Sequence, residues 1–593
     1  MHSPSRPKSA ELTAGAVAAG IGRRNANSTN PFASTEKTQN DRRRADSPGS
    51  FPVQSNCATN LNHQRTSLPR NVATPILAFA DYWDEVGTMS ITEEKTEVAT
   101  PPTAAPPAVR WPALVTAGGV VTALLLVLAP RHGYYLDELY FRVAGRHLDW
   151  GYEDQPPLVA LLAAVQTALF GDTVTALRVV PAVLAGVGVV VAGLIARELG
   201  GGGAAQLVAA AAAGGAMSSL AAGHTLHPTA VDHLVWLTIC WLLIRLVRTG
   251  NSRLWLAIGV VAGIGMQSKN LVVLLVLGLL GGLLLTGQRA LLRDRFLVFG
   301  VLLGLAIAAP ALLWQATHGW PQFTVAGELS GSPDVNTAIS FVIGQFLFGG
   351  LLLAPVWIGG LVALLRRPDW RPYRAIGLAY LLIVVALLAL GGFPRYNEGI
   401  LVALVAIGAV PAVRWARTRL KQTILVVAVV ANAALNAIVV LPILPVQSYL
   451  DNPVLAGLGG EVQTGQTGAE ELAEQVAAVY RELAEADQQK TVIYGHDYSQ
   501  AGAVDRYGAG LPRAYSGNNS YAGFGIPGDD KTLVIAIGVE KATFSGLFTS
   551  CEVRGKLTFA LPNINQDKEI LVCGGPKEPW SAIWQKLHWT GTF

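Results

Sequence analysis

The chain has 593 residues, of which 51% are hydrophobic and only 14% charged, and its mean hydropathy is +0.39. Soluble domains carry about 25% charged residues, so these charges are too few to cover a water-soluble protein of this length. The four cysteines exclude a disulfide-rich scaffold, and a net charge of +4 without a basic stripe excludes a nucleic-acid-binding protein. The composition therefore predicts a polytopic α-helical membrane protein with some soluble mass.

The first 108 residues differ from the rest of the chain. They are rich in Ser, Thr, Asn, Pro, Arg and Glu and show no sustained hydrophobic periodicity, which is typical of a disordered segment. Met89 begins the stretch MSITEEKTEV, which has the character of a native start. We therefore expect residues 1–88 to be an upstream extension that was called in error.

Apolar segments follow in close succession over residues 109–445. Most have the roughly 17–25 residues that a helix needs to span a bilayer, and we predict about eleven spans. They lie near 112–130, 177–196, 205–223, 229–247, 254–268, 270–286, 296–316, 339–365, 375–391, 398–413 and 422–444.

Lys and Arg residues in the short loops predict the orientation. If the N-terminus is cytoplasmic, the cytoplasmic loops carry fifteen Lys and Arg residues and the opposite loops carry six. Positive charges concentrate on the cytoplasmic side of membrane proteins. We therefore expect residues 131–176, residues 317–338 and everything after about residue 445 to lie outside the cell membrane.

The tail, residues 446–593, no longer resembles a membrane segment. Residues 469–487 have the spacing of an amphipathic helix. The runs TVIYG, TLVIAIG, KLTFA and EILVCG are rich in β-forming residues and are bounded by turn residues. We predict a small exported α/β domain. Cys551 and Cys573 both lie in it, and in an exported domain they are candidates for a disulfide; the alternative is two unpaired buried thiols.

The first outer loop, RHGYYLDELYFRVAGRHLDWGYEDQPPL, holds the most informative polar residues. We predict a helix over 139–150 and a second over 157–170, both lying along the membrane surface. Asp137 and Glu138 follow the first span by a few residues. A partly desolvated carboxylate in this position can act as a general base, or it can cap a helix or pair with Arg142.

Other polar groups gather where later spans meet the outside. His227 and Asp232 lie in AAGHTLHPTAVDHLVW, which is either a metal site or a polar helix end. Lys269 and Arg395 are either anion ligands or snorkelling residues. Trp320 in LLWQATHGWPQF belongs either to an interfacial aromatic belt or to a sugar-stacking site.

Together these segments resemble the GT-C membrane glycosyltransferases, and in particular glycosyltransferase family 39, with its protein O-mannosyltransferases and lipid A aminoarabinose transferases. The resemblance covers residues from about 110 to 593. It rests on DELY and DQPPL in the first outer loop, and on RYGAGLPRAYSGNNSYAGFG and GGPKEPWSAIWQKLHW in the tail.

The resemblance implies transfer of a sugar from a polyprenyl-phosphate carrier to a hydroxyl of a protein, lipid or glycan, with inversion, at the outer face of the membrane. It implies no certain cofactor and leaves a divalent metal open. Where some relatives have a lysine before the Pro pair, this chain has Gln155, which leaves the donor sugar, mannose or arabinose among others, undetermined.

The resemblance also implies roles for individual residues. Asp137 would be the general base, and Glu138 would orient the acceptor or substitute for the base. Asp154 and Asp232 would be further acidic positions. Lys269 and Arg395 would bind the donor phosphate, while His227, Tyr396 and Trp320 would contact the sugar or nearby loops.

Two other functions fit a chain of this composition. A transporter of lipid-linked sugars would show internal repeats and charges at the membrane midplane, and the sequence shows neither. A non-catalytic membrane scaffold would keep the fold without the chemistry.

Overall fold

The computed structural model describes residues 105–329 and 334–591. The predicted upstream extension, residues 1–88, and nearly all of the predicted disordered segment lie outside the described residues. Within the described residues, seven helical segments are long and apolar enough to cross a membrane. They are α2 (Trp111–Leu128), α5 (Val174–Glu198), α8 (Pro228–Thr249), α11 (Arg295–Thr317), η3 with α15 (Pro368–Tyr373 and Arg374–Ala389), η4 with α16 (Pro394–Asn397 and Glu398–Trp415) and α17 (Arg419–Val440).

The remaining predicted spans are shorter or broken. The pair α6 (Gly203–Gly214) and α7 (Met217–His224) is bent by 56° and counts as an eighth span if the two helices cross together. Helices α9 (Leu254–Met266) and α10 (Val272–Leu284) have 13 residues each. At about 1.5 Å per residue, each is shorter than the roughly 30 Å hydrocarbon core. The predicted number of about eleven full spans is therefore not confirmed.

One predicted span, 339–365, is wrong as a single helix. The structure has α13 (Val335–Phe348) and α14 (Ala354–Arg366) with a turn between them. Gly350 in this turn has φ of +89°, a conformation that glycine adopts readily and other residues avoid. Pro355 then stands in the first turn of α14, where its missing N–H costs nothing.

Close contact between helices depends on small residues. A Cβ atom added to Gly118 of α2 would lie 2.5 Å from the carbonyl oxygen of Gly186 in α5. A Cβ added to Gly186 would lie 2.7 Å from the carbonyl oxygen of Gly118. Only hydrogen atoms fit at this crossing, which is the usual way in which membrane helices bring their backbones together.

The loop after α2, which the sequence predicts to be the first outer loop, contains α3 (Leu136–Ala144) and α4 (Leu158–Phe170). The second agrees with the predicted helix 157–170. The first does not continue to residue 150, because Gly145 caps it and the chain from there to Pro157 is irregular. The buried Tyr152 fixes this irregular part, since its hydroxyl donates to the carbonyl of His147 at 3.0 Å.

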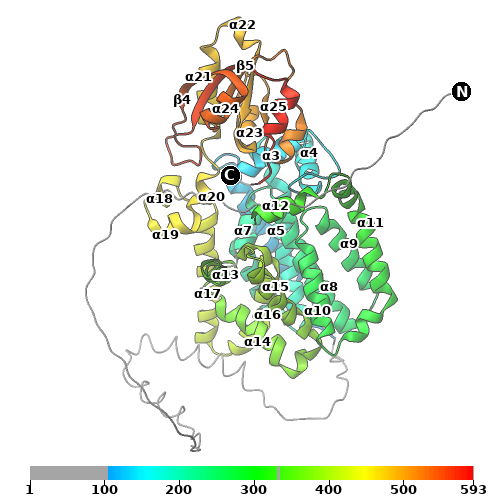
Figure 1. The fold of residues 1–593 in the computed structure, drawn as a ribbon. Helices are drawn as coiled ribbons and strands as arrows, with labels where there is room; N and C mark the ends of the chain where they lie inside the picture. The colour runs from blue at the N-terminus through cyan, green and yellow to red at the C-terminus, as the bar shows by residue number, and fades with distance from the viewer. Residues whose placement is uncertain (1–104, 330–333, 592–593) are drawn as a thin grey trace, which may run out of the picture. The chain divides into compact units, whose positions relative to one another are not determined.

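The tail forms a five-stranded sheet with the order β2-β1-β3-β5-β4. The first three strands in this order are parallel and the last two are antiparallel to their neighbours. The strands are β1 (Thr491–Gly495), β2 (Ala514–Ser516), β3 (Leu533–Ile537), β4 (Phe548–Lys556) and β5 (Glu569–Pro576). The helices of this domain are α21 (Ala469–Arg481), α22 (Glu485–Gln488), α23 (Tyr498–Tyr507), α24 (Lys541–Leu547) and α25 (Trp580–Leu587). Figure 1 shows two of these strands, β4 and β5, beside helix α24.

Three of the four predicted strands are present, as β1, β3 and β5. The predicted strand KLTFA is wrong, because β4 occupies FTSCEVRGK and ends at Lys556. Most residues of β4 are exposed or half-buried, so the strand lacks the alternation of apolar and polar residues by which such strands are recognised.

Shorter helices connect these parts of the chain. They are η2 (Arg289–Arg293), α12 (Pro321–Leu329), α18 (Val446–Leu450), α19 (Pro453–Leu455), η5 (Ala456–Gly460), α20 (Glu461–Thr464) and η6 (Asn519–Phe524).

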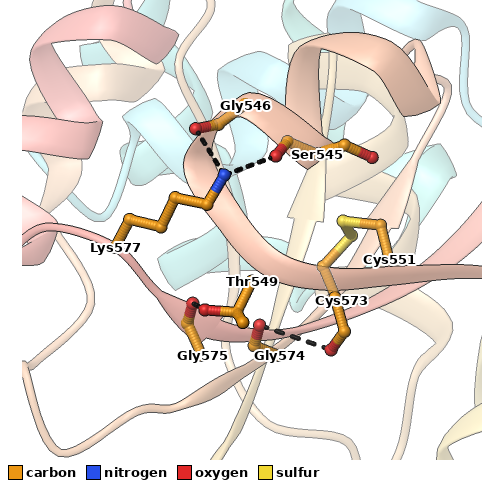
Figure 2. Close-up of a disulfide and its surroundings, with 9 residues drawn as sticks. Ser545, Gly546, Thr549, Cys551, Cys573, Gly574, Gly575 and Lys577 are labelled. Atoms are coloured by element: carbon orange, nitrogen blue, oxygen red, sulfur yellow. Dashed lines mark hydrogen bonds between the residues drawn. A yellow bond between two sulfur atoms is a disulfide. The ribbon is translucent and has the colours of Figure 1, made fainter.

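A disulfide joins Cys551 of β4 to Cys573 of β5, which are direct partners across the two strands (Figure 2). Close by, the Lys577 ammonium donates to the carbonyl oxygens of Ser545 and Gly546 at 2.8 and 3.3 Å. These bonds attach the end of β5 to helix α24.

The first outer loop and the α/β domain share one hydrophobic core. Its buried residues include Leu139 and Phe141 of α3, Val159 of α4, Val476 of α21 and Val504 of α23. The domain therefore packs directly on the loop that carries the candidate general base.

Candidate active site

Asp137 occupies the second position of α3, and groups from two distant parts of the chain face its carboxylate. Its Oδ1 accepts a hydrogen bond of 2.7 Å from the hydroxyl of Tyr498, the first residue of α23. Its Oδ2 lies 3.4 Å from Nε2 of His227, which directly precedes α8. The Asp137 side chain keeps 22% of its surface exposed, so it remains open to a substrate.

The contacts of His227 define which of its ring nitrogens carries the proton. Its Nδ1 accepts the backbone N–H of Thr229 at 3.2 Å and thereby caps α8. A neutral imidazole has one donor and one acceptor nitrogen, so Nε2 carries the hydrogen and points it toward Asp137. Burial, with the nearby charges of Lys269 and Arg395, lowers the pKa of His227 to about 3, and the ring is neutral at physiological pH.

Burial raises the pKa of Asp137 above its usual range. The hydrogen bond from Tyr498 and the positive charge of Arg395 oppose this effect, and the negative charge of Glu138 adds to it. A raised pKa makes the ionised carboxylate a stronger base.

A second carboxylate lies on the other side of a pair of tyrosines. The Tyr140 hydroxyl donates to Oδ1 of Asp154 at 2.7 Å. The ring centres of Tyr140 and Tyr498 lie 4.8 Å apart. Each of these two phenols therefore donates to a different carboxylate, Tyr140 to Asp154 and Tyr498 to Asp137. Burial raises the pKa of Asp154 to about 7, and the negative charges of Glu153 and Asp137 contribute.

Glu138 adopts a different environment from its neighbour. Its side chain is fully buried and pairs with Arg178 of α5, with N–O distances of 2.7 and 3.0 Å. It also accepts the backbone N–H groups of Tyr135 and Leu226 at 2.9 and 3.0 Å. This environment disfavours the predicted contact of Glu138 with an acceptor; in the structure the residue connects α3 to α5 and to the segment before α8.

The two cations singled out in the sequence lie close to His227. Lys269 follows α9, and its ammonium donates to the Thr229 hydroxyl at 3.2 Å and lies 5.7 Å from the ring centre of Tyr396. Arg395 belongs to η4, and its guanidinium lies 5.0 Å from the ring centre of Phe393. The positive charge of Arg395 acts to lower the pKa of Asp137.

Two acidic residues act electrostatically on Lys269. The negative charges of Asp232 and Glu398 act on its ammonium. Oδ1 of Asp232 accepts the indole N–H of Trp236, one turn along α8, at 2.9 Å.

Trp320 lies apart from this cluster. It precedes α12, packs its ring on Phe323 at 5.7 Å and is 41% exposed. Within residues 105–329 and 334–591, no hydrogen bond or ring contact joins it to Asp137, His227 or Lys269. In the same ranges no group of three or more His, Cys, Asp or Glu side chains could hold a metal ion.

Sequence reasoning missed Tyr498, Tyr140 and Arg178. Asp497 and Gln500 form a capping box at the start of α23, and this pattern can be recognised in a sequence. It marks a helix start only; nothing local in the chain indicates that Tyr498 meets a carboxylate 361 residues away.

Part of the chain is similar to a known protein family. The model of the family described as dolichyl-phosphate-mannose-protein mannosyltransferase matches residues 154–314. This range includes Asp154, His227, Asp232 and Lys269, while Asp137 lies before it. No curated protein matches the chain.

Two solved structures share the architecture. ArnT from Cupriavidus metallidurans in the apo state is 18% identical, with a TM-score of 0.53, over 78% of this chain and 97% of that one. ArnT from the same organism bound to undecaprenyl phosphate is 17% identical, with a TM-score of 0.53, over 78% of this chain and 98% of that one.

The chain has the GT-C fold. The family match and the shared fold together support a multi-pass membrane glycosyltransferase of GT-C type.

Proposed function

We propose that the protein transfers a sugar from a polyprenyl-phosphate carrier to a hydroxyl acceptor at the outer face of the cell membrane. The observation that carries this proposal is the placement of Asp137, a half-buried carboxylate fixed by Tyr498 and His227 in a chain with the GT-C fold. A carboxylate held in this way can take a proton from an incoming hydroxyl.

The proposed reaction needs Asp137 as its single base, and every bond formed is matched by a bond broken. Asp137 accepts the proton of the acceptor hydroxyl, and the acceptor oxygen forms a bond to the anomeric carbon of the donor sugar. The bond between that carbon and the carrier phosphate oxygen breaks on the opposite face, and the electron pair leaves with the polyprenyl phosphate. Attack from the face opposite the leaving group inverts the anomeric centre.

Lys269 and Arg395 are the residues proposed to bind the donor phosphate. Both are cations whose charges act on His227, and the charge of Arg395 also lowers the pKa of Asp137. A cation beside the leaving phosphate would stabilise its negative charge as the glycosidic bond breaks. The similarity to a structure described as bound to undecaprenyl phosphate supports a carrier of this chemical class.

The proposed orientation follows from the charges of the loops. The side predicted to be cytoplasmic carries fifteen Lys and Arg residues against six on the opposite side. Asp137, Lys269 and Arg395 all belong to the opposite side, as does the α/β domain that packs on α3.

Radiolabel transfer tests the proposal. Membranes containing the full chain are supplied with undecaprenyl phosphate that carries tritiated mannose or, in parallel, tritiated arabinose. Wild type should label membrane acceptors, and Asp137→Asn should lower the rate by about 10²–10⁴-fold, the usual contribution of a general base.

The matched control is Asp530→Asn, which changes a 73% exposed aspartate of the α/β domain and should leave the rate unchanged. Equal transfer by wild type and Asp137→Asn would remove Asp137 from the mechanism. Absence of transfer from every carrier-linked sugar would overturn the proposed function.

A further inference from the structure

We propose that Tyr498 is a positioning residue for Asp137, and that the α/β domain thereby supplies a working part of the active site. This inference rests on the proposed function. It assigns a role to a domain that otherwise shows only its packing on the first outer loop.

The backbone of Tyr498 is rigidly held. It follows Asp497, a fully buried residue whose carboxylate accepts the backbone N–H groups of Ser499 and Gln500 at 2.9 and 3.0 Å. The N–H of Tyr498 itself donates to the side chain of Asn518 at 3.3 Å. The end of β1 and the start of α23 therefore fix the position of the Tyr498 backbone, from which the phenol side chain extends.

One face of α23 docks on α3. Tyr498, Gly502 and Asp505 are spaced four and three residues apart, which places them on a single helix face. A Cβ atom added to Gly502 would lie 2.9 Å from Cβ of Leu139, so the two helices are already in contact. Asp505 pairs with Arg142 of α3 at 2.5 Å.

The phenol ring is also fixed. Tyr498 is only 7% exposed, and its ring packs against Tyr140. Its hydroxyl reaches Oδ1 of Asp137 at 2.7 Å, so the bond forms without the usual cost of ordering a free side chain.

The chemistry of this bond favours the ionised base. Burial and the charges of Asp137 and Asp154 raise the pKa of Tyr498 well above its usual value, so the phenol keeps its proton and acts as a donor. A donor to a carboxylate stabilises the ionised form. A carboxylate oxygen has two lone pairs, so Oδ1 can still accept the proton of an acceptor hydroxyl.

Several other groups act on Asp137 and remain unchanged when Tyr498 is altered. His227 faces Oδ2 from the start of α8, and Arg395 acts from η4. Glu138 acts from the same helix, and the charge of Asp137 in turn raises the pKa of Tyr135 and Asp154. The Tyr498 bond is thus one of several contributions to the pKa of Asp137.

The test is the pH profile of kcat/KM for undecaprenyl-phosphate-linked tritiated sugar, measured on full-length protein in nanodiscs. In wild type the rate should rise with pH as Asp137 ionises. Tyr498→Phe removes the donor, so this rise should move to higher pH by about one unit or more. Below the rise the rate should fall about tenfold, and well above it the two profiles should converge.

Tyr507→Phe is the matched control, because Tyr507 ends the same helix and packs against Tyr134 instead of Asp137; its profile should overlay that of wild type. Tyr498→3-fluorotyrosine should move the rise to lower pH, because its more acidic hydroxyl is a stronger donor. This variant keeps the shape of the ring and decides the question even if Tyr498→Phe fails to fold.

A profile for Tyr498→Phe that overlays wild type, or one lowered equally at all pH values, would overturn the inference. A rate for Asp137→Asn equal to that of wild type would instead show that the proposed general base is wrong. The two failures are therefore distinguishable.

Discussion

Asp137 and Glu138 are adjacent carboxylates that the structure places in opposite environments. Successive residues of an α-helix point about 100° apart, so one side chain of the pair faces Tyr498 and His227 while the other faces Arg178 in the interior. Only the first keeps exposed surface. The helix geometry thus makes Asp137 available as a candidate base and places Glu138 in a buried ion pair.

The raised pKa of Asp154 predicts a pH-dependent stability. Its carboxyl has an ordinary pKa of 3.8 and, when buried in the folded protein, a pKa of about 7. Between these values the folded state binds more protons than the unfolded state, so ionisation destabilises the fold increasingly from about pH 4 to pH 7, with no further change above. Asp154→Asn stays neutral, so its advantage in melting temperature over wild type should grow over this range and then level off.

Differential scanning fluorimetry of the two proteins in detergent, from pH 4 to pH 9, measures this difference. Asp530→Asn, at an exposed site, serves as the control and should show a constant difference. A difference for Asp154→Asn that does not change with pH would contradict the prediction.

At the scale of secondary-structure elements, α3 is held from two sides. Glu138 ties it to α5 through Arg178, and Arg142 ties it to Asp172 and to α23 through Asp505. These contacts are polar and specific, and they lie beside the apolar core that the loop containing α3 shares with the α/β domain. The candidate base, Asp137, therefore belongs to a helix whose position depends on contacts with both the membrane part and the α/β domain.

Breaking the buried pair should be costly. Glu138→Ala leaves the Arg178 guanidinium, which is 1% exposed, without its charged partner, and the loss of one partner of a buried ion pair costs about 3–5 kcal/mol. Glu578→Ala removes an exposed partner of Lys586 and should cost less than about 1 kcal/mol. Thermal melting followed by tryptophan fluorescence should rank the two, and equal shifts would argue against the ion pair as a stabilising contact.

A substitution at Gly502 tests whether the packing of α23 on α3 matters for activity. Alanine at this position needs the two helices to move apart, since its Cβ would lie 2.9 Å from that of Leu139. We expect Gly502→Ala to lower the transfer rate several-fold by displacing Tyr498, while the α/β domain keeps its own fold. Gly546→Ala, in open space on α24, is the control, and equal rates for the two variants would disprove the link between docking and activity.

At the scale of the whole molecule, the disulfide lies in strands that do not carry the site. Cys551 and Cys573 join β4 and β5, whereas Tyr498 follows β1, which is separated from β5 by β3. The Cys551→Ser, Cys573→Ser double variant opens a loop of 22 residues and should lose about 3 kcal/mol of stability. Transfer at a temperature well below melting should continue.

Reductant provides the control for this prediction. It should lower the melting temperature of wild type toward that of the double variant and leave the double variant unchanged. Loss of transfer in the double variant at low temperature, with its fold intact, would mean that β4 and β5 do reach the site.

The sequence by itself determined the membrane character, the GT-C resemblance, the three strands with strong apolar patterns and the acidic residues of the first outer loop. The membrane character and the strands follow from composition and periodicity, which are local properties of a chain, whereas the resemblance rests on motifs such as DELY and DQPPL. The number of full spans, the break at Gly350 and the exposed strand β4 were not predictable, because short helices, a positive φ and a polar strand leave weak local patterns.

Only the tertiary structure decided which of the acidic residues is available and what holds it. Asp137 and Glu138 look alike in the sequence, and their environments differ because α5 and α23 approach α3 from different sides. The bond between Asp137 and Tyr498 joins residues 361 positions apart. Such a pairing depends on how the α/β domain docks on the first outer loop, and the packing of a shared core, not any local pattern, sets that arrangement.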